Sequence, residues 1–384
     1  MKNYDLIILG AGASSLMCAG NLSKKISVAI VEHNGEIAKK MKISGGGKCN
    51  ITNVDVKTEH FDGDKELVSY ALNKFSKEKL LRFLERNRVP LELRKGRYYF
   101  CKHSADEIID VLKYNAKNAD LLLEHEVKSV TKEGEMFSVL TDKSTLQARA
   151  VVVATGAKSY EKIGASAKGL EIARSFGIGY NLFEPALVGL TLQQEQSWMK
   201  DLSGLSTFVH IKVGDKLLKE EMLFAHKGIS GPAVLSASLY WRKGEISIDF
   251  LPNTPIKELT QGTKKLLSSV MDMPKRLAKE LLKAVNVEDI ECNKLTKEQN
   301  NKLQKLHHYT FSPAGNFGFS KAEVCRGGVV SEELEHTTLM SKKVDNLYFI
   351  GEVVDVTGEL GGYNFQWAFS SGVVCANSLK KVLV

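Results

Sequence analysis

The chain has 384 residues, of which 43% are hydrophobic and 26% are charged, and its formal net charge is +8. This length and composition indicate a globular protein of two or three domains, and no stretch predicts a membrane span or a signal peptide. Lysine and arginine are spread along the chain, so we attribute their excess to solubility and to some attraction for anionic ligands.

The six cysteines are dispersed, and no two form a C-x-x-C pair. This spacing argues against a zinc site and against an adjacent redox dithiol, and single cysteines fit a reducing compartment. We therefore predict a cytoplasmic protein that binds no metal and no membrane.

The N-terminal segment predicts a βαβ unit. Residues 4–9 (YDLIIL) are an apolar run typical of a strand that is buried on both faces. A glycine-rich turn (GAGASS), a segment with helical spacing and a second apolar run at 27–31 follow, and Glu32 comes directly after that run. Strand, glycine turn, helix, strand and acid in this order form the pattern of a dinucleotide-binding unit.

The positions of this pattern have distinct physical roles. Gly10 permits the tight turn, and Gly12 lets a phosphate approach the backbone without meeting a Cβ. Glu32 is placed to accept hydrogen bonds from a ribose and disfavours a 2′-phosphate, so we expect an adenosine nucleotide such as FAD or NAD. We expect the helix to begin with Ala13, Ser14 and Ser15, whose N–H groups would point at the pyrophosphate. Ser15 stands where the fingerprint has its last glycine.

Residues 44–53 (SGGGKCNITN) place three consecutive glycines beside a lysine and a cysteine. A P-loop would need glycine at Lys42 and serine or threonine at Cys49, so that motif is excluded. Consecutive backbone N–H groups can form an anion-binding nest, to which Lys48 adds charge. We expect a loop that lies against an extended cofactor, and a flexible loop without a ligand is the alternative.

The following elements are predicted from hydrophobic spacing. A helical region is expected at 65–88, a hairpin at 92–101 and a helix at 104–118, followed by strands at 121–130, 136–140 and 146–154. The last of these strands runs into ATGA, and a buried strand at 346–350 leads into a second glycine-rich turn and a C-terminal helix. Three buried strands that end in small residues indicate one extended ligand rather than three sites.

Five segments together resemble the bacterial FAD-binding oxidoreductases that are labelled aminoacetone oxidase-like. They are residues 4–19, 44–53, 151–160, 224–238 and 347–372, and the triple-glycine and GGYNFQWA blocks are the most specific. The resemblance implies an α/β fold with a Rossmann-like FAD-binding domain, an inserted β-rich domain and a small helical domain. We place these domains at 1–184 with 336–384, at 185–255 with 312–335, and at 256–311.

The resemblance also implies which residues hold a non-covalent FAD. Val127 would meet the adenine through its backbone, Asp355 would approach the ribityl and phosphate portion, and Gly361 to Asn364 would line the isoalloxazine ring. Besides the N-terminal residues named above, the predicted cofactor set contains His33, Lys40, Ser44, Gly45, Gly46, Lys48, Cys49, Asn50, Ala154, Thr155, Gly156, Gly351, Glu352, Gly362 and Tyr363.

The expected function is FAD-dependent oxidation or reduction of a small molecule, and no residue is assigned as the catalytic acid. Tyr160, Tyr363, Lys48 and Cys49 are candidates near the ring, although a structural role is favoured for each. NAD(P)H is a candidate transient donor, because the chain carries only one dinucleotide fingerprint. A flavin-dependent RNA-modifying enzyme, which predicts a basic cluster beside the flavin, and a flavoprotein sensor without turnover are the alternatives. We do not expect nucleic acid as the partner.

Overall fold

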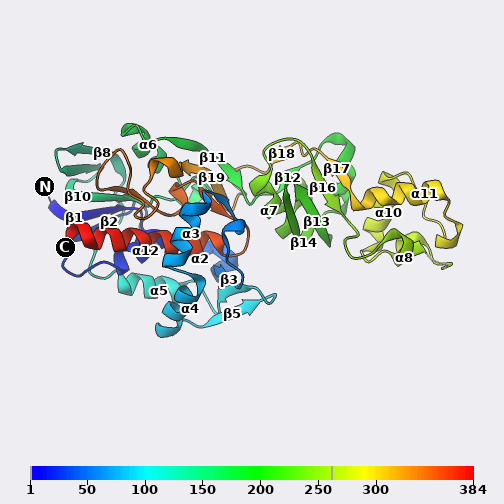
Figure 1. Cartoon of the computed structure of the whole chain (residues 1–384), viewed down its shortest axis with the longest axis horizontal. Coiled ribbons are helices and arrows are strands. Elements are labelled where there is room, and N and C mark those ends of the chain that lie inside the picture. The colour runs from blue at the N-terminus through cyan, green and yellow to red at the C-terminus, as the bar shows by residue number, and fades with distance from the viewer. Residues whose placement is uncertain (1, 261–262) are drawn as a thin grey trace. The chain divides into compact units, whose positions relative to one another are not determined.

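The computed structural model describes residues 2–260 and 263–384, and these form two compact units. The first unit runs to Glu184 and resumes at Val324, and the second comprises Pro185–Glu323. Both ends of the chain therefore belong to the first unit, where they are drawn in blue and red (Figure 1). Residues 324–335, which we expected in the inserted domain, belong instead to the first unit, where β19 (Val324–Val329) pairs with β11 (Tyr180–Ala186).

The centre of the first unit is a sheet of seven strands in the order β7-β2-β1-β10-β9-β8, with β20 also paired to β10. β7, β2, β1, β10 and β20 are parallel to one another, whereas β9 pairs antiparallel with both β10 and β8. The strands are β1 (Lys2–Leu9), β2 (Val28–Val31), β7 (Asp120–Leu122), β8 (Val127–Glu133), β9 (Met136–Thr141), β10 (Thr145–Val153) and β20 (Leu347–Phe349).

Burial on both faces explains why these strands are apolar runs. Leu6 to Leu9 of β1 and Ala150 to Val153 of β10 are fully buried, as a parallel sheet covered by helices requires. The helix α1 (Ala13–Gly20) packs against α12 (Tyr363–Leu383) and α5 (Asp106–Asn115). The expected Rossmann-like architecture is confirmed.

One predicted strand is wrong. Residues 121–130 form two strands, β7 and β8, because Glu124 turns the chain with a φ of 56°. The turn is fixed by backbone hydrogen bonds from Glu124 to Asn34 and from His125 to Glu32. These contacts join segments that are far apart in the sequence, so the spacing of hydrophobic residues near Glu124 could not predict the turn.

Smaller elements complete the first unit. A three-stranded sheet has the order β3-β6-β5, and β4 pairs with β21 in an antiparallel ribbon. The strands are β3 (Asn50–Asn53), β4 (Phe61–Gly63), β5 (Leu91–Arg94), β6 (Tyr98–Cys101) and β21 (Val356–Gly358), and the helices are α2 (Lys39–Gly47), α3 (Lys65–Lys74), α4 (Lys77–Arg86) and α6 (Lys168–Ser175).

The second unit contains an antiparallel sheet in the order β17-β16-β13-β14-β15-β12-β18. Apolar residues of β13, β14, α7 and α10 share one core, so the further division into a β-rich and a helical domain stays a prediction. The strands are β12 (Leu190–Thr191), β13 (Ser206–Val213), β14 (Lys216–Ala225), β15 (Gly228–Ser230), β16 (Ile246–Asp249), β17 (Tyr309–Phe311) and β18 (Gly315–Asn316). The helices are α7 (Pro232–Tyr240), α8 (Ile256–Thr260), α9 (Leu267–Val270), α10 (Lys275–Ala284) and α11 (Lys297–Leu303). None of the helices within 2–260 and 263–384 is long and apolar enough to cross a membrane.

Candidate cofactor site

Three strand ends meet at one edge of the parallel sheet. The Ala154 amide donates to the Leu9 carbonyl at 2.9 Å, and the Ile350 amide donates to the Val153 carbonyl at 3.1 Å. The turns after β1, β10 and β20 therefore lie side by side. In an open parallel sheet, ligands bind at the carboxyl ends of the strands, so this edge is the candidate site.

Gly10 and Gly12 have different surroundings in the first turn. Gly10 has a φ of 99°, and a Cβ built there would lie 2.5 Å from the carbonyl oxygen of Ala154. A Cβ on Gly12 would meet no atom within 4 Å. The backbone at Gly12 thus faces open space of the kind that a pyrophosphate would need.

Two helices begin at this site without a side-chain cap. α1 follows Gly12 and α12 follows Gly362, and neither first turn contains an acidic residue. The first N–H groups of a helix have no partner within the helix and favour anions or carbonyl oxygens. Both helix ends can therefore donate hydrogen bonds to a cofactor, as predicted for Ser14 and Ser15 at one end and Tyr363 and Asn364 at the other.

Three buried side-chain oxygens near these turns have no hydrogen-bond partner within the described part of the chain. They are Ser15 Oγ, Asn50 Oδ1 and Thr155 Oγ1. A buried polar atom without a partner is costly, so each is a position where a ligand atom is expected. The residues present therefore fit a cofactor with many polar atoms, as FAD is.

Glu32 lies directly after β2 and is 8% exposed. Its Oε2 accepts from the Ala11 amide at 2.8 Å, and its Oε1 accepts from the Asn34 amide at 2.9 Å. Burial acts to raise the pKa of Glu32, but the hydrogen bonds from His33 and these amides outweigh it and lower the pKa. The carboxylate is therefore ionised at neutral pH and keeps lone pairs for a ribose hydroxyl.

The triple-glycine segment is not a plain loop. Residues 39–47 form α2, which is interrupted at Ser44, Gly45 and Gly46, and β3 follows. A Cβ on Gly46 would meet no atom within 4 Å, so this backbone is open in the same way as Gly12.

Lys40, in the first turn of α2, connects this segment to the turn after β20. Its Nζ lies 2.7 Å from Glu352 Oε2 and donates to Ser159 Oγ at 2.7 Å. Lys40 therefore joins α2 to the turn after β20 through Glu352 and to the segment after β10 through Ser159.

Cys49 does not have the surroundings of a reactive thiol. It is fully buried, and burial raises the pKa of the Cys49 thiol far above its usual range. Its neighbour Cys101 is also buried, which raises the pKa of that thiol to about 12, and both are free cysteines. A thiolate at Cys49 is thus disfavoured at neutral pH.

The turn before α12 packs tightly on β3 and β6. A Cβ on Gly361 would lie 2.7 Å from the ring of Tyr98, and one on Gly362 would lie 2.6 Å from the backbone of Thr52. Asn53 Nδ2 donates to the Gly361 carbonyl at 3.1 Å. The predicted ring-binding residues Gly361 and Gly362 are therefore next to the segment that follows the triple glycines.

Asp355 and Asn364, which are also predicted to contact FAD, have protein partners. Asp355 accepts from Asn181 Nδ2 at 2.7 Å and from the Gly327 amide at 3.0 Å. Asn364 closes a pair of hydrogen bonds with Gly358, each 2.9 Å long. Val127 is buried at the start of β8. The assignments of these three residues to FAD stay predictions.

Sequence reasoning did not find His60 or the charge on the β5–β6 hairpin. His60 precedes β4 and stacks on Tyr363 with the ring centroids 4.7 Å apart. The hairpin carries Arg94, Lys95 and Arg97, and Arg97 lies 4.6 Å from the centre of the Tyr98 ring. Basic residues are followed directly by aromatic residues in the hairpin sequence, but only the structure shows that the hairpin lies against Gly361.

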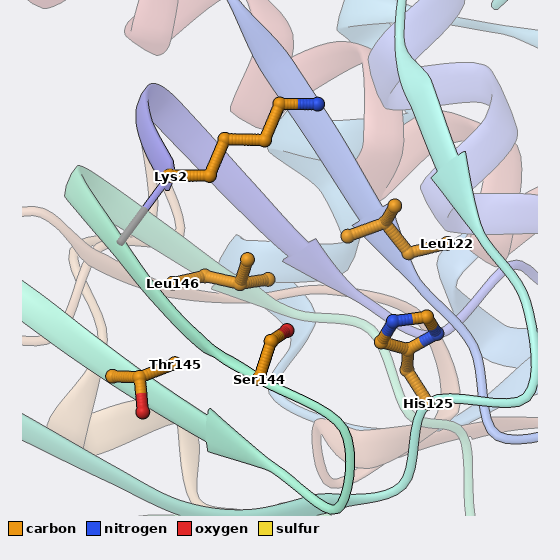
Figure 2. Close-up of a pocket in the computed structure, with 6 residues that line it drawn as sticks. All are labelled: Lys2, Leu122, His125, Ser144, Thr145 and Leu146. Atoms are coloured by element: carbon orange, nitrogen blue, oxygen red, sulfur yellow. The ribbon is translucent and has the colours of Figure 1, made fainter.

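A separate hollow of about 550 Å³ lies on the sheet (Figure 2). None of the predicted cofactor residues lines it, so it is distinct from the candidate site. Its lining residues are Lys2, Leu122, His125, Ser144, Thr145 and Leu146.

Comparisons with known proteins agree with this geometry. The family described as HI0933-like protein Rossmann domain matches residues 4–378. The chain is 35% identical to a ribosomal RNA dihydrouridine synthase of Haemophilus influenzae, over 99% of this chain and 100% of that protein. It is 33% identical to a ribosomal RNA dihydrouridine synthase of Escherichia coli, over 99% of this chain and 98% of that protein.

A more distant relative acts on a different class of molecule. The chain is 27% identical to a 3-dehydro-bile acid delta(4,6)-reductase of Clostridium scindens, over 97% of this chain and 98% of that protein. Among solved structures, the quinol fumarate reductase FrdA of E. coli has a TM-score of 0.53 at 14% identity, covering 100% of this chain and 71% of that one. That likeness shows the fold alone. The chain belongs to the HI0933-like family of Rossmann-fold, FAD-dependent oxidoreductases.

Proposed function

We propose that this protein reduces a uridine of ribosomal RNA to dihydrouridine with electrons carried by FAD. The observation that carries the proposal is the similarity to two ribosomal RNA dihydrouridine synthases over the full length of both. This replaces our expectation of a small-molecule substrate and of no nucleic-acid partner.

The β5–β6 hairpin supports RNA as the substrate. Arg94, Lys95 and Arg97 lie at its turn, and Tyr98 on the same hairpin contacts the Gly361 turn. Arginine and lysine next to aromatic rings are suited to phosphates and to unstacked bases. A basic cluster beside the flavin is what the RNA-modifying alternative required.

The test is direct. The purified protein with FAD and a reduced nicotinamide is incubated with ribosomal RNA that lacks dihydrouridine, and nuclease digests are analysed by mass spectrometry. We expect one uridine to become two hydrogen atoms heavier at a single site. Unchanged RNA, together with flavin that stays reduced in its presence, would contradict the proposal.

Reduction of a conjugated double bond in a small molecule is the second candidate, favoured by the similarity to the bile acid reductase. It predicts that a cyclic enone reoxidises the reduced flavin and that ribosomal RNA does not.

We infer that a reduced nicotinamide, if it is the donor, binds only briefly, because the chain has one dinucleotide fingerprint. Stopped-flow mixing with NADH and NADPH tests this, and flavin bleaching that saturates at micromolar donor would count against it.

A further inference from the structure

A titratable cluster lies at the turn that leads into α12. His60 Nδ1 is 3.3 Å from Glu359 Oε2, and its Nε2 is 3.6 Å from Asp55 Oδ2. The Glu359 amide also donates to the His60 carbonyl at 2.8 Å. The two residues are 299 positions apart in the chain, so only the fold brings them together.

The cluster is fixed to the candidate cofactor site. β4 and β21 pair with Phe61 opposite Gly358, which sets His60 beside the first residue of the turn 359–362. The His60 ring stacks on Tyr363, the first residue of α12, with an interplanar angle of 22°. The imidazole therefore lies at the end of the helix that the resemblance assigns to the isoalloxazine ring.

The reaction under "Proposed function" needs a proton donor, and the present inference rests on that function. Saturating the C5–C6 bond of uracil adds one hydride and one proton, and FAD, when bound and reduced by a nicotinamide, supplies the hydride. The proton has to come from a positioned acid that is protonated at neutral pH and has a pKa close to it.

The other candidates in this region are less suited to donate a proton. Cys49 is fully buried. Tyr363 is 5% exposed, and burial raises the pKa of its phenol far above the usual range. Lys48 lies beside Glu92, with the charged atoms 3.7 Å apart. Its pairing partner therefore belongs to the hairpin and not to the turn before α12.

His60 has the required properties. Its side chain is 25% exposed, so a substrate can reach it. The hydrogen bond to Glu359 raises the pKa of His60, and this effect outweighs burial, which acts to lower it. Nε2 lies 3.6 Å from Asp55 Oδ2, which is longer than a normal hydrogen bond, so Asp55 attracts the charged ring while the Nε2 proton can pass to a substrate.

We propose that His60 is the proton donor of the reduction. Its Nε2–H bond breaks as a C–H bond forms at uracil C5, while the hydride is added at C6. The imidazole is left neutral beside Glu359 and takes a new proton from solvent. Glu359 is a positioning residue, because it acts on the reaction only through the ring of His60.

The pH dependence follows from the groups around the imidazole. These are the carboxylates of Asp55, Glu59 and Glu359, the lysines at 57 and 65, and the phenol of Tyr363. A histidine with a raised pKa is charged below that pKa and loses its proton as the pH rises through it. The rate of substrate reduction should therefore fall on the alkaline side, and Glu359→Gln should move this fall to lower pH.

The experiment separates the two half-reactions in wild type, His60→Gln and Glu359→Gln, each loaded with FAD. FAD content and melting temperature check that the variants are folded. Bleaching of the flavin by a reduced nicotinamide should be the same in all three proteins. Reoxidation by ribosomal RNA should be about 100- to 10,000-fold slower in His60→Gln, the usual contribution of a general acid.

A second readout does not depend on turnover. The visible absorption of the bound, oxidised flavin is titrated with pH in the absence of RNA. We expect an inflection in wild type, the same inflection at lower pH in Glu359→Gln, and none in His60→Gln.

The outcomes distinguish the two claims. The role of His60 is overturned if RNA reoxidises the flavin of His60→Gln as fast as that of wild type, or if the inflection in Glu359→Gln does not move. Either result leaves the proposed function standing. Reduced wild-type flavin that RNA does not reoxidise overturns both.

Discussion

At the scale of single residues, two glycines of the cofactor site have different roles: one is required by the fold and the other leaves space for a ligand. A side chain at Gly10 would collide with the Ala154 carbonyl, whereas the space beside Gly12 is open to 4 Å. The two positions look equivalent in the sequence, because both belong to one fingerprint. Their different surroundings allow folding and binding to be tested separately.

Gly12→Ala should leave the stability of the cofactor-free protein unchanged and weaken FAD binding, because its Cβ would occupy the space intended for a phosphate. Gly10→Ala should lower the free energy of unfolding by about 1–3 kcal/mol, since its φ is positive. Urea unfolding and FAD titration of both apoproteins check this. Equal FAD affinity in Gly12→Ala and wild type would contradict the phosphate assignment.

Cys49 should resist alkylation in the native protein. Its thiol is fully buried and its pKa is raised, so little thiolate is present even at mildly alkaline pH. Mass spectrometry after iodoacetamide treatment should find Cys49 unmodified in the folded protein and fully modified in urea. Rapid modification in the native state would restore Cys49 as a candidate nucleophile.

At the scale of elements, the β5–β6 hairpin is expected to contact RNA phosphates. Replacing Arg94, Lys95 and Arg97 by glutamine should weaken RNA binding. On single-stranded RNA, the negative slope of the logarithm of the association constant against the logarithm of the salt concentration should become shallower by about 0.7 for each phosphate that the variant no longer neutralises. FAD content should not change. The matched control replaces Lys24, Lys25 and Lys113, exposed cations outside the hairpin, by glutamine.

The slope is measured by filter binding or fluorescence anisotropy over a range of salt concentrations. The control should keep the wild-type slope, because it removes the same charge elsewhere. A hairpin variant with an unchanged slope would show that the RNA does not contact this element.

The elements also show what local spacing can predict. β1, the turn, α1, β2 and Glu32 were predictable because a buried strand and a glycine turn impose their pattern within a few neighbours. The break between β7 and β8 was not, since hydrogen bonds to Asn34 and Glu32 create it. The turns at residues 154 and 361 were predicted from buried strands that end in small residues, and the resemblance supplied their expected contacts with FAD. His60 was missed because its partner Glu359 is 299 positions away.

At the scale of the whole molecule, FAD should stabilise only one of the two units. All predicted cofactor residues belong to the first unit, and a ligand stabilises the state that binds it. When free FAD is about 100 times its dissociation constant, it should stabilise that unit by about 2.7 kcal/mol. Calorimetry should therefore show the unfolding transition of that unit at a higher temperature. A single transition that shifts as a whole would show that the units unfold together.

The first unit closes its sheet with β20 and its helical layer with α12, both from the last part of the chain. A ribosome that is still making the second unit has therefore produced six of the seven strands of the sheet, and the face of α1 that α12 later covers is still bare. Flavin capture has to wait until α12 has been made, so chains that stop before α12 would be colourless and would expose the apolar surface of α1 to proteases.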